Sequence, residues 1–376
     1  MKLVVIPSEK LSDYTNKGLV NLKEYYNPNG YFDEVFLLSP LEKEERFEFG
    51  MKIIPIKNSK SYKKKLLEIK PNVVRAYGGY WASRFAIFNT SDIPVVVSLH
   101  DTHPWICYDS IKYTDHCICM TEAVRKLALK KSVNSERVTV LPNRVSLENF
   151  PPNSQLIDEF EYLNNTRYIL HIGRKTYQKN LETVIASLVE IDKDIKLVCI
   201  GMGNKDRYVR LAKELNVLER CIWLDSVPND RLSGFYSNSI AFVLPTRWEG
   251  FGVVFIEAAS SGVPIITSNL APMNEFLKDG ENALLLKDCE SVLETSEKIK
   301  MLINNSNLRS RIINNAIETS QLYSREKINS EEVGIYKNVI KTSQVRSRPT
   351  LLRKVIIYMK SFMTYTIYRV ESKVRK

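Results

Sequence analysis

The chain has 376 residues and a mass of 43.4 kDa, more than one hydrophobic core usually supports, so its length predicts two or three domains. Hydrophobic residues make up 44% and charged residues 26%, a balance that excludes a collagen, a coiled coil and a wholly disordered chain. The net charge of +11 is concentrated in residues 341–376, where ten Lys or Arg accompany one Glu, and the nearly neutral remainder argues against a nucleic-acid-binding protein.

Short β-branched apolar runs alternate with amphipathic segments along the chain, as is typical of βαβ units. The first half has predicted strands at 2–6, 34–38, 52–56, 73–77, 94–99, 116–120 and 137–141, with helices at 62–69, 81–88 and 121–131. A proline-containing break at 149–154 precedes predicted strands at 168–172, 196–200, 221–224, 240–244 and 264–267, with helices at 181–189, 205–215, 230–237 and 253–260. Beyond residue 290 the pattern is helical.

This rhythm predicts an α/β fold with two Rossmann-like parallel-sheet domains, residues 1–150 and 151–335, followed by a helical, basic segment at 336–376. The cleft between two such domains is the natural ligand site, so we expect the domains to face a central cleft.

The six cysteines never form C-x-x-C, so we expect neither a zinc site nor a disulfide framework. The apolar run in MKLVVIPSEK is too short for a signal-peptide core, and the longest uncharged run, 258–274, is interrupted by Ser, Gly, Pro and Asn. We therefore expect a cytoplasmic protein.

The stretch Pro245-Thr-Arg-Trp-Glu-Gly-Phe-Gly252 leads from a predicted strand into a predicted helix. The backbone N–H groups at the start of that helix, near Gly250, Phe251, Gly252 and Val253, would attract an anion. Glu249 and Glu257 could accept hydrogen bonds from the hydroxyls of a sugar and a ribose. The alternative is a solvated loop with two surface acids.

A second cluster, His171-Ile-Gly173-Arg174-Lys-Thr-Tyr-Gln-Lys179, follows the first strand of the same domain. Arg174 and Lys179 would clamp a diphosphate together with the helix terminus. Gly201-Met-Gly203 after the next strand forms a turn that lets the backbone approach a ligand. The alternative for the basic residues is an exposed, solvated turn.

Together these motifs resemble the retaining glycosyltransferases of the GT-B fold, specifically glycosyltransferase family 4, the group 1 glycosyltransferases. Residues 168–286 contain, in the family's order, G-R-x4-K, a G-x-G turn, E-G-F-G, E-x7-E and G-x-P-I. The resemblance implies that Arg174 and Lys179 bind the donor diphosphate and that Gly173, Gly201 and Gly203 line the donor site. It further implies that Glu257 holds the donor ribose and that Glu249 contacts the transferred sugar, assisted by backbone around Ala271, Pro272 and Met273.

The resemblance is looser in the amino-terminal domain. Pro94-Val-Val-Val-Ser-Leu-His100-Asp101 is similar to the family's strand ending in a histidine beside the sugar-transfer centre, which implies a catalytic role for His100 and an acceptor-side position for Asp101. The family's first-loop glycine pair is absent, and Lys17-Gly18 is the nearest equivalent for the acceptor side. The residues alone favour a structural role for His100, and it is the domain context that favours the catalytic one.

The carboxyl-terminal tail, residues 346–376, has apolar residues at helical spacing among basic ones over residues 351–370, which predicts an amphipathic basic helix there. Such a helix would lie on an anionic membrane surface or pack against the first domain, and periodicity does not distinguish these partners.

We therefore expect a transferase that moves a hexose-type sugar from a nucleotide-sugar donor to a saccharide or lipid-linked acceptor, in polysaccharide or glycolipid synthesis. No D-x-D motif follows a predicted strand, so we expect no metal and no other cofactor. The rivals are a GT-B epimerase or phosphorylase and a non-catalytic nucleotide-sugar-binding subunit. For such a transferase we expect a cytoplasmic location with peripheral attachment to the inner face of the membrane.

Overall fold

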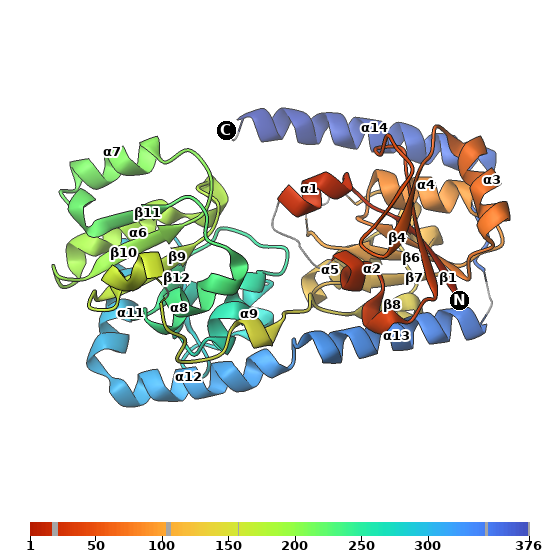
Figure 1. Cartoon of the computed structure of the whole chain (residues 1–376). Helices are drawn as coiled ribbons and strands as arrows, with labels where there is room; N and C mark the ends of the chain where they lie inside the picture. Colours follow the sequence, from red (N-terminus) through yellow and green to blue (C-terminus); the bar gives the residue numbers. More distant parts are fainter. Residues whose placement is uncertain (17–21, 103–106, 157, 343–344, 375–376) are drawn as a thin grey trace. The chain divides into compact units, whose positions relative to one another are not determined.

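The chain folds into two compact units, which we call unit 1 (residues 1–142 and 326–376) and unit 2 (residues 143–325). The structure is a computed structural model that describes residues 1–16, 22–102, 107–156, 158–342 and 345–374 (Figure 1). Each unit has its own sheet and its own hydrophobic core, and each is described by itself below.

Unit 1 is built on an eight-stranded sheet in the order β3-β4-β2-β1-β5-β6-β7-β8, in which only the β3–β4 pair is antiparallel. Its strands are β1 (Lys2–Ile6), β2 (Glu34–Ser39), β3 (Arg46–Glu48), β4 (Met51–Pro55), β5 (Val73–Tyr77), β6 (Val95–Leu99), β7 (His116–Cys119) and β8 (Val138–Val140). Its helices are α1 (Leu11–Asn16), α2 (Leu22–Tyr26), α3 (Ser59–Ile69), α4 (Trp81–Asn89), η3 (Asp109–Tyr113), α5 (Glu122–Lys130), α13 (Arg325–Thr342) and α14 (Leu351–Val374).

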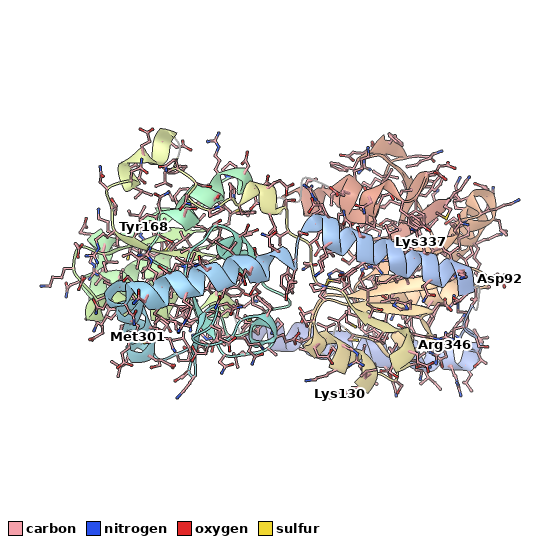
Figure 2. All side chains as sticks on the ribbon, turned by 90° about the horizontal axis from the view of Figure 1, so that it is seen from below. Asp92, Lys130, Tyr168, Met301, Lys337 and Arg346 are labelled. Atoms are coloured by element: carbon pink, nitrogen blue, oxygen red, sulfur yellow. The ribbon has the colours of Figure 1, made fainter. Side chains whose placement is uncertain are left out.

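Both faces of this sheet are covered, because successive side chains of a strand point to opposite sides. Val4 and Ile6 of β1 belong to a core shared with α3, α4, α5 and α14. Leu3 and Val5 belong to a second core shared with α1, α2 and α13. Figure 2 shows α13, which carries the labelled Lys337, lying across unit 1.

Unit 2 is built on a six-stranded, all-parallel sheet in the order β11-β10-β9-β12-β13-β14. Its strands are β9 (Tyr168–Ile172), β10 (Lys196–Ile200), β11 (Cys221–Leu224), β12 (Phe242–Leu244), β13 (Ile265–Ser268) and β14 (Leu284–Leu286). Its helices are α6 (Leu181–Ser187), α7 (Asp206–Glu214), α8 (Leu232–Ser237), α9 (Val253–Ser260), α10 (Met273–Phe276), α11 (Val292–Asn304) and α12 (Ser306–Gln321).

The core of unit 2 is also divided by its sheet. Leu170 packs with residues of α8, α9 and α12, whereas Ile169 packs with residues of α6, α7 and α11. The two parallel-sheet α/β domains and the helical carboxyl-terminal segment are thus as predicted from the sequence.

The unit boundaries differ from the predicted residues 150 and 335. Phe150 is 1% exposed and lies in the core of unit 2, so the proline-containing break belongs to that unit. Ile328, Tyr336 and Val339 of α13 lie in the core of unit 1. The chain therefore enters unit 2 after Pro142 and returns to unit 1 after Arg325, which makes unit 1 discontinuous in sequence.

Candidate active site

The predicted donor-site residues gather where the strands of unit 2 end. Because carboxyl ends of parallel strands share one edge, the loops after β9, β10 and β12 meet there. Gly201 follows β10 with a φ of 140°, and a Cβ built on it would lie 2.2 Å from the carbonyl oxygen of Gly173. Only glycine allows these two backbone segments to approach so closely.

Gly252 starts α9 in the left-handed conformation, with a φ of 85°. A Cβ there would lie 2.6 Å from Cδ2 of Phe255, so the turn into the helix requires glycine. The first N–H groups of α9 lack intrahelical acceptors by the geometry of any α-helix, and they lie at the end of this turn. This arrangement is the one that binds phosphate groups in many α/β proteins.

Lys179 and Glu249 form an ion pair between the loop after β9 and the loop after β12. Their side chains are only 13% and 8% exposed, so each charge depends on the other for stabilisation. The Thr246 hydroxyl lies 3.2 Å from Oε1 of Glu249. The predicted diphosphate-binding lysine and the predicted sugar-contacting glutamate are therefore in direct contact.

His171 holds the backbone of the loop after β9 in position. It is 1% exposed, and its Nε2–H donates to the carbonyl oxygen of Lys179 over 3.2 Å. Burial lowers the pKa of His171 to about 4, so the ring stays neutral near pH 7. His171 is therefore a positioning residue. The sequence analysis placed it in the cluster before Arg174 but assigned it no role.

Lys175 is a buried lysine that sequence analysis did not single out. Its Nζ donates to the carbonyl oxygen of Gly201 and lies 3.6 Å from Oδ1 of Asp225. It thereby connects the loops after β9, β10 and β11. From the sequence, Lys175 is indistinguishable from an exposed lysine next to Arg174. Only the tertiary structure shows that its ammonium group is enclosed.

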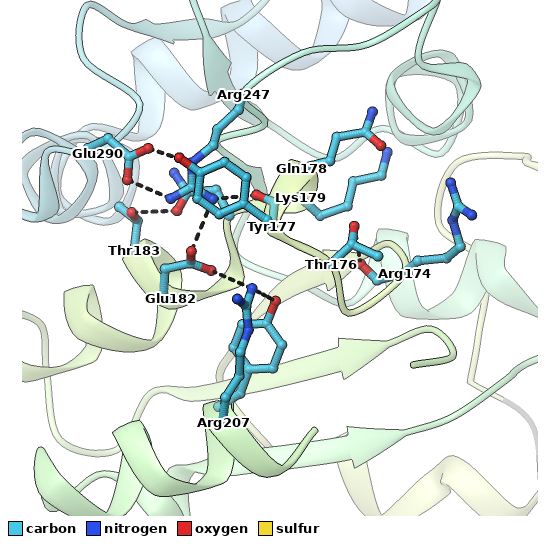
Figure 3. A network of polar contacts seen from close by, with 12 residues as sticks. Arg174, Thr176, Tyr177, Gln178, Lys179, Glu182, Thr183, Arg207, Arg247 and Glu290 are labelled. Atoms are coloured by element: carbon cyan, nitrogen blue, oxygen red, sulfur yellow. Dashed lines mark hydrogen bonds and ion pairs between the residues drawn. The ribbon is translucent and has the colours of Figure 1, made fainter. Parts of the chain in front are cut away.

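Arg174, in contrast, has an exposed side chain. In Figure 3 it points away from the polar network of this loop, and among the described residues no ion pair to its guanidinium is seen. It is therefore the cation of the G-R-x4-K motif that solvent or a ligand reaches most directly.

The network in Figure 3 centres on Arg247, which is flanked by Glu182 at 3.0 Å and Glu290 at 2.5 Å. Its guanidinium also lies 3.7 Å from the ring centroid of Tyr177. These contacts hold the turn before Glu249 against the loop that contains Lys179. Arg247 was not among the predicted site residues, since its partners are distant in sequence.

Glu257 lies in the second turn of α9 and is 6% exposed. Tyr236 donates a hydrogen bond from its hydroxyl to Oε2 of Glu257 over 3.1 Å. Burial raises the pKa of Glu257 to about 7, although the Tyr236 hydrogen bond opposes that rise. The carboxyl group is thus poised to change protonation near neutral pH.

The other predicted donor-site residues divide into backbone and core positions. Phe251 and Met273 are buried among apolar side chains, so only their backbone groups can contact a ligand. Gly203 has a φ of 127° in the loop after β10. The remaining positions are Gly250 in the turn before α9, Val253 at its first residue, and Ala271 and Pro272 immediately before α10.

Unit 1 contains a separate cavity of about 310 Å³ that includes His100 and Asp101. His100 follows β6 and stacks on Tyr77 with ring centroids 5.9 Å apart. Tyr14, Tyr25 and Tyr80 also line the cavity, as do the consecutive glycines Gly78 and Gly79 after β5. The tyrosines come from three separate stretches of the sequence, at residues 14, 25 and 77–80, which is why sequence analysis missed them.

Lys17 and Gly18, the predicted acceptor-side pair, lie outside the described residues. Within the described ranges no group of three or more His, Cys, Asp or Glu could hold a metal ion. None of the helices in the described part of the chain is long and apolar enough to cross a membrane.

Comparison with known proteins places these features in context. Residues 155–319 match the family of glycosyl transferases group 1. The uncharacterized glycosyltransferase MJ1607 of Methanocaldococcus jannaschii is 25% identical over 351 residues, which cover 84% of this chain and 87% of that protein. The chain is thus similar to group 1 glycosyl transferases over residues 155–319 and to a glycosyltransferase over most of its length.

Two further relatives have informative names. The capsular polysaccharide biosynthesis glycosyltransferase CapM of Staphylococcus aureus is 28% identical over 60% of this chain and 62% of that protein. The UDP-Gal:alpha-D-GlcNAc-diphosphoundecaprenol alpha-1,3-galactosyltransferase of Escherichia coli is 28% identical over 56% of this chain and 59% of that protein.

Solved structures confirm the predicted fold class. A glycosyltransferase from Rickettsia africae has a TM-score of 0.76 at 16% identity, covering 90% of this chain and 98% of that one. The Anabaena protein HepE in complex with UDP-glucose has a TM-score of 0.71 at 15% identity, covering 91% and 100%. At these identities the likeness establishes the GT-B fold.

Proposed function

We propose that this glycosyltransferase moves a hexose-type sugar from a nucleotide-sugar donor to a saccharide or lipid-linked saccharide acceptor, with retention of configuration as in family 4. The observation that carries the proposal is the loop cluster of unit 2, where Lys179, Glu249 and the start of α9 converge inside the segment that matches group 1 glycosyl transferases. The names of CapM and of the Escherichia coli galactosyltransferase support a role in polysaccharide or glycolipid synthesis.

In this proposal the donor diphosphate binds to Arg174, Lys179 and the first N–H groups of α9. As the bond between the sugar and the phosphate breaks, negative charge develops on the leaving diphosphate, and these groups stabilise it. Lys179 and the start of α9 are held in place before the donor arrives, whereas the exposed Arg174 would move onto the diphosphate. Because they already supply positive charge, we propose that transfer needs no metal ion or other cofactor.

Glu257 would accept hydrogen bonds from the donor ribose, and Glu249 would contact hydroxyls of the transferred sugar. Glu249 stays anchored by Lys179 and Thr246, which fixes its carboxylate for that contact. The acceptor would bind at the unit 1 cavity, with His100 beside the reacting hydroxyl and Asp101 on the acceptor side. The departing phosphate would take the acceptor proton in a front-face displacement.

The proposal also includes the location predicted from the sequence, cytoplasmic and peripheral on the inner membrane face, with residues 346–376 toward an anionic surface. Nucleic acid is not among the proposed partners, because the basic excess lies in this one segment.

The first test is thermal stabilisation of the purified protein by UDP-sugars, GDP-sugars and free nucleotides. We expect one base class to raise the melting temperature and expect Arg174→Ala and Glu257→Gln to remove most of that rise. Arg210→Ala, at an exposed arginine on α7, is the matched control and should retain it.

Turnover of the stabilising donor then separates the rivals. Transfer to an added acceptor that persists in EDTA supports the proposal. Conversion of the donor without an acceptor would indicate an epimerase, and a requirement for orthophosphate would indicate a phosphorylase. Donor binding without any turnover would favour a non-catalytic binding subunit, and strict dependence on Mg²⁺ or Mn²⁺ would contradict the metal-free mechanism.

A further inference from the structure

Helix α14 packs on unit 1 with its least apolar side. Ile357 and Ser361 are buried, at 4% and 3% exposure, and Lys354 donates from Nζ to the carbonyl oxygen of Phe88 over 2.6 Å. Ile357 is thus the main apolar side chain by which the described part of α14 joins the core of unit 1.

The opposite side of α14, which we call the outer face, is exposed and apolar. Leu351 is 79% exposed and Phe362 is 64% exposed. With about 100° of rotation per residue, the exposed apolar residues fall on the arc opposite Ile357. The outer face comprises Leu351, Leu352, Val355, Ile356, Tyr358, Met359, Phe362 and Met363.

This orientation is the reverse of an ordinary packing helix, in which the apolar stripe faces the core. A contiguous exposed patch of this kind marks an interaction surface. The tail is nevertheless tied firmly to unit 1, because Arg348 donates to the carbonyl oxygens of Thr90, Ile93 and Tyr113 and pairs with Asp115 at 2.8 Å. The outer face is therefore presented by a fixed helix.

A second cavity, of about 260 Å³, lies beside the outer face, between α14 and η3. Three cations line it, Lys112 from η3 and Arg353 and Lys360 from α14. The one acidic lining residue, Asp109, already pairs with Lys131 at 3.1 Å and with Lys360 at 3.7 Å. The apolar side chain of Ile356 belongs both to the cavity wall and to the outer face.

We propose that the outer face of α14 inserts into an anionic phospholipid bilayer and that the cavity between α14 and η3 binds a lipid phosphate. Cations directly beside exposed apolar side chains match the phosphates and acyl chains of a lipid. A second copy of the chain fits less well, because residues 341–376 contain ten basic residues and one acid, so two such helices would repel. This inference rests on the peripheral location in the proposed function and names the surface that would provide it.

The short segment 107–109 links the proposed phosphate cavity to the proposed acceptor cavity. Cys107 lines the cavity that contains His100, and Asp109, two residues later, lines the phosphate cavity. Docking through α14 would thus place the acceptor cavity of unit 1 near the lipid surface, where a lipid-linked acceptor is concentrated.

The test is co-flotation of the full chain with vesicles of phosphatidylcholine alone or mixed in equal parts with phosphatidylglycerol. We expect binding to the mixed vesicles only, weakened by added salt. Phe362→Glu and Arg353→Gln should each weaken it by about tenfold. Leu293→Glu, at an exposed leucine of α11, and Lys213→Gln, at an exposed lysine of α7, are matched controls and should bind normally.

Three results would overturn the proposal. These are equal binding to both vesicle types, absence of binding to either, and a wild-type dimer in sedimentation that Phe362→Glu dissociates. Stabilisation by inorganic phosphate without vesicle binding would show a simple anion site instead. Nucleotide-induced stabilisation, measured on the same preparations, separates failure of this inference from failure of the proposed donor site.

Discussion

The candidate sites of unit 2 and unit 1 are lined by different kinds of residue. In unit 2 the polar side chains are fixed by one another, through the Lys179–Glu249 ion pair, the Lys175 contacts and the Arg247 network. In unit 1 the cavity around His100 is lined largely by tyrosines and a glycine turn. A site of paired charges suits one fixed anionic ligand, whereas aromatic walls suit the varied faces of sugars. Removing a residue should therefore cost more folding stability in unit 2 than in unit 1.

The largest expected effect is at the close backbone approach in unit 2. Gly201→Ala would place a Cβ 2.2 Å from the carbonyl oxygen of Gly173, so we expect a loss of about 3 kcal/mol or more in the free energy of unfolding. Urea denaturation measures it.

Gly280→Ala is the matched control for that substitution. Gly280 also has a positive φ, of 73°, but a Cβ there meets nothing within 4 Å, so the loss should be about 1 kcal/mol. Equal losses in the two variants would show that the approach of the two loops does not constrain unit 2.

The next effect is the pH dependence caused by Glu257. Its pKa rises from 4.5 to about 7 on folding, so the folded state binds more protons than the unfolded state between these values. The unfolding free energy should therefore fall by about 3 kcal/mol as pH rises through that interval.

Glu257→Gln cannot titrate and should lack this fall. Denaturation of both proteins at several pH values between 4.5 and 8 measures the difference. Parallel profiles would mean that folding does not raise the pKa of Glu257.

A smaller effect is expected for the coupling of Lys179 and Glu249. A double-mutant cycle with Lys179→Met and Glu249→Gln should give about 1–3 kcal/mol of interaction energy, because both side chains are largely enclosed. The exposed pair Lys65–Glu68 should give no more than about 0.5 kcal/mol. Similar coupling energies for the two pairs would remove the contrast between enclosed and exposed charges.

The smallest stability effect is expected in the unit 1 cavity. His100→Ala removes a ring stacked on Tyr77 and should cost less than about 1 kcal/mol of stability, as for most partly exposed positions. If His100 acts beside the reacting hydroxyl, turnover should nevertheless fall about a hundredfold. A large stability loss with normal turnover would instead make His100 a structural residue.

Several parts of the fold could be predicted from local sequence. The strands at 73–77, 168–172, 196–200 and 221–224 have the observed bounds, because buried parallel strands read as short β-branched runs. The short strands β3 and β14 were missed, because β3 has two charged residues beside Phe47 and β14 consists of three leucines without a β-branched residue. Apart from Glu257, the motif residues of unit 2 were found because each lies in a loop after a strand or near the start of a helix, where backbone geometry restricts the choice of residue.

The sequence by itself determined the alternation of strands and helices, the order of the donor-site motifs and the concentration of positive charge in the tail. Only the tertiary structure decided that Phe150 belongs to unit 2, that α13 returns to the core of unit 1, and which side of α14 is exposed. It also decided that Lys175 is enclosed and Lys179 paired while Arg174 is exposed. The physical reason is that periodicity reports on neighbours along the chain, whereas burial and ion pairing depend on residues that topology brings together.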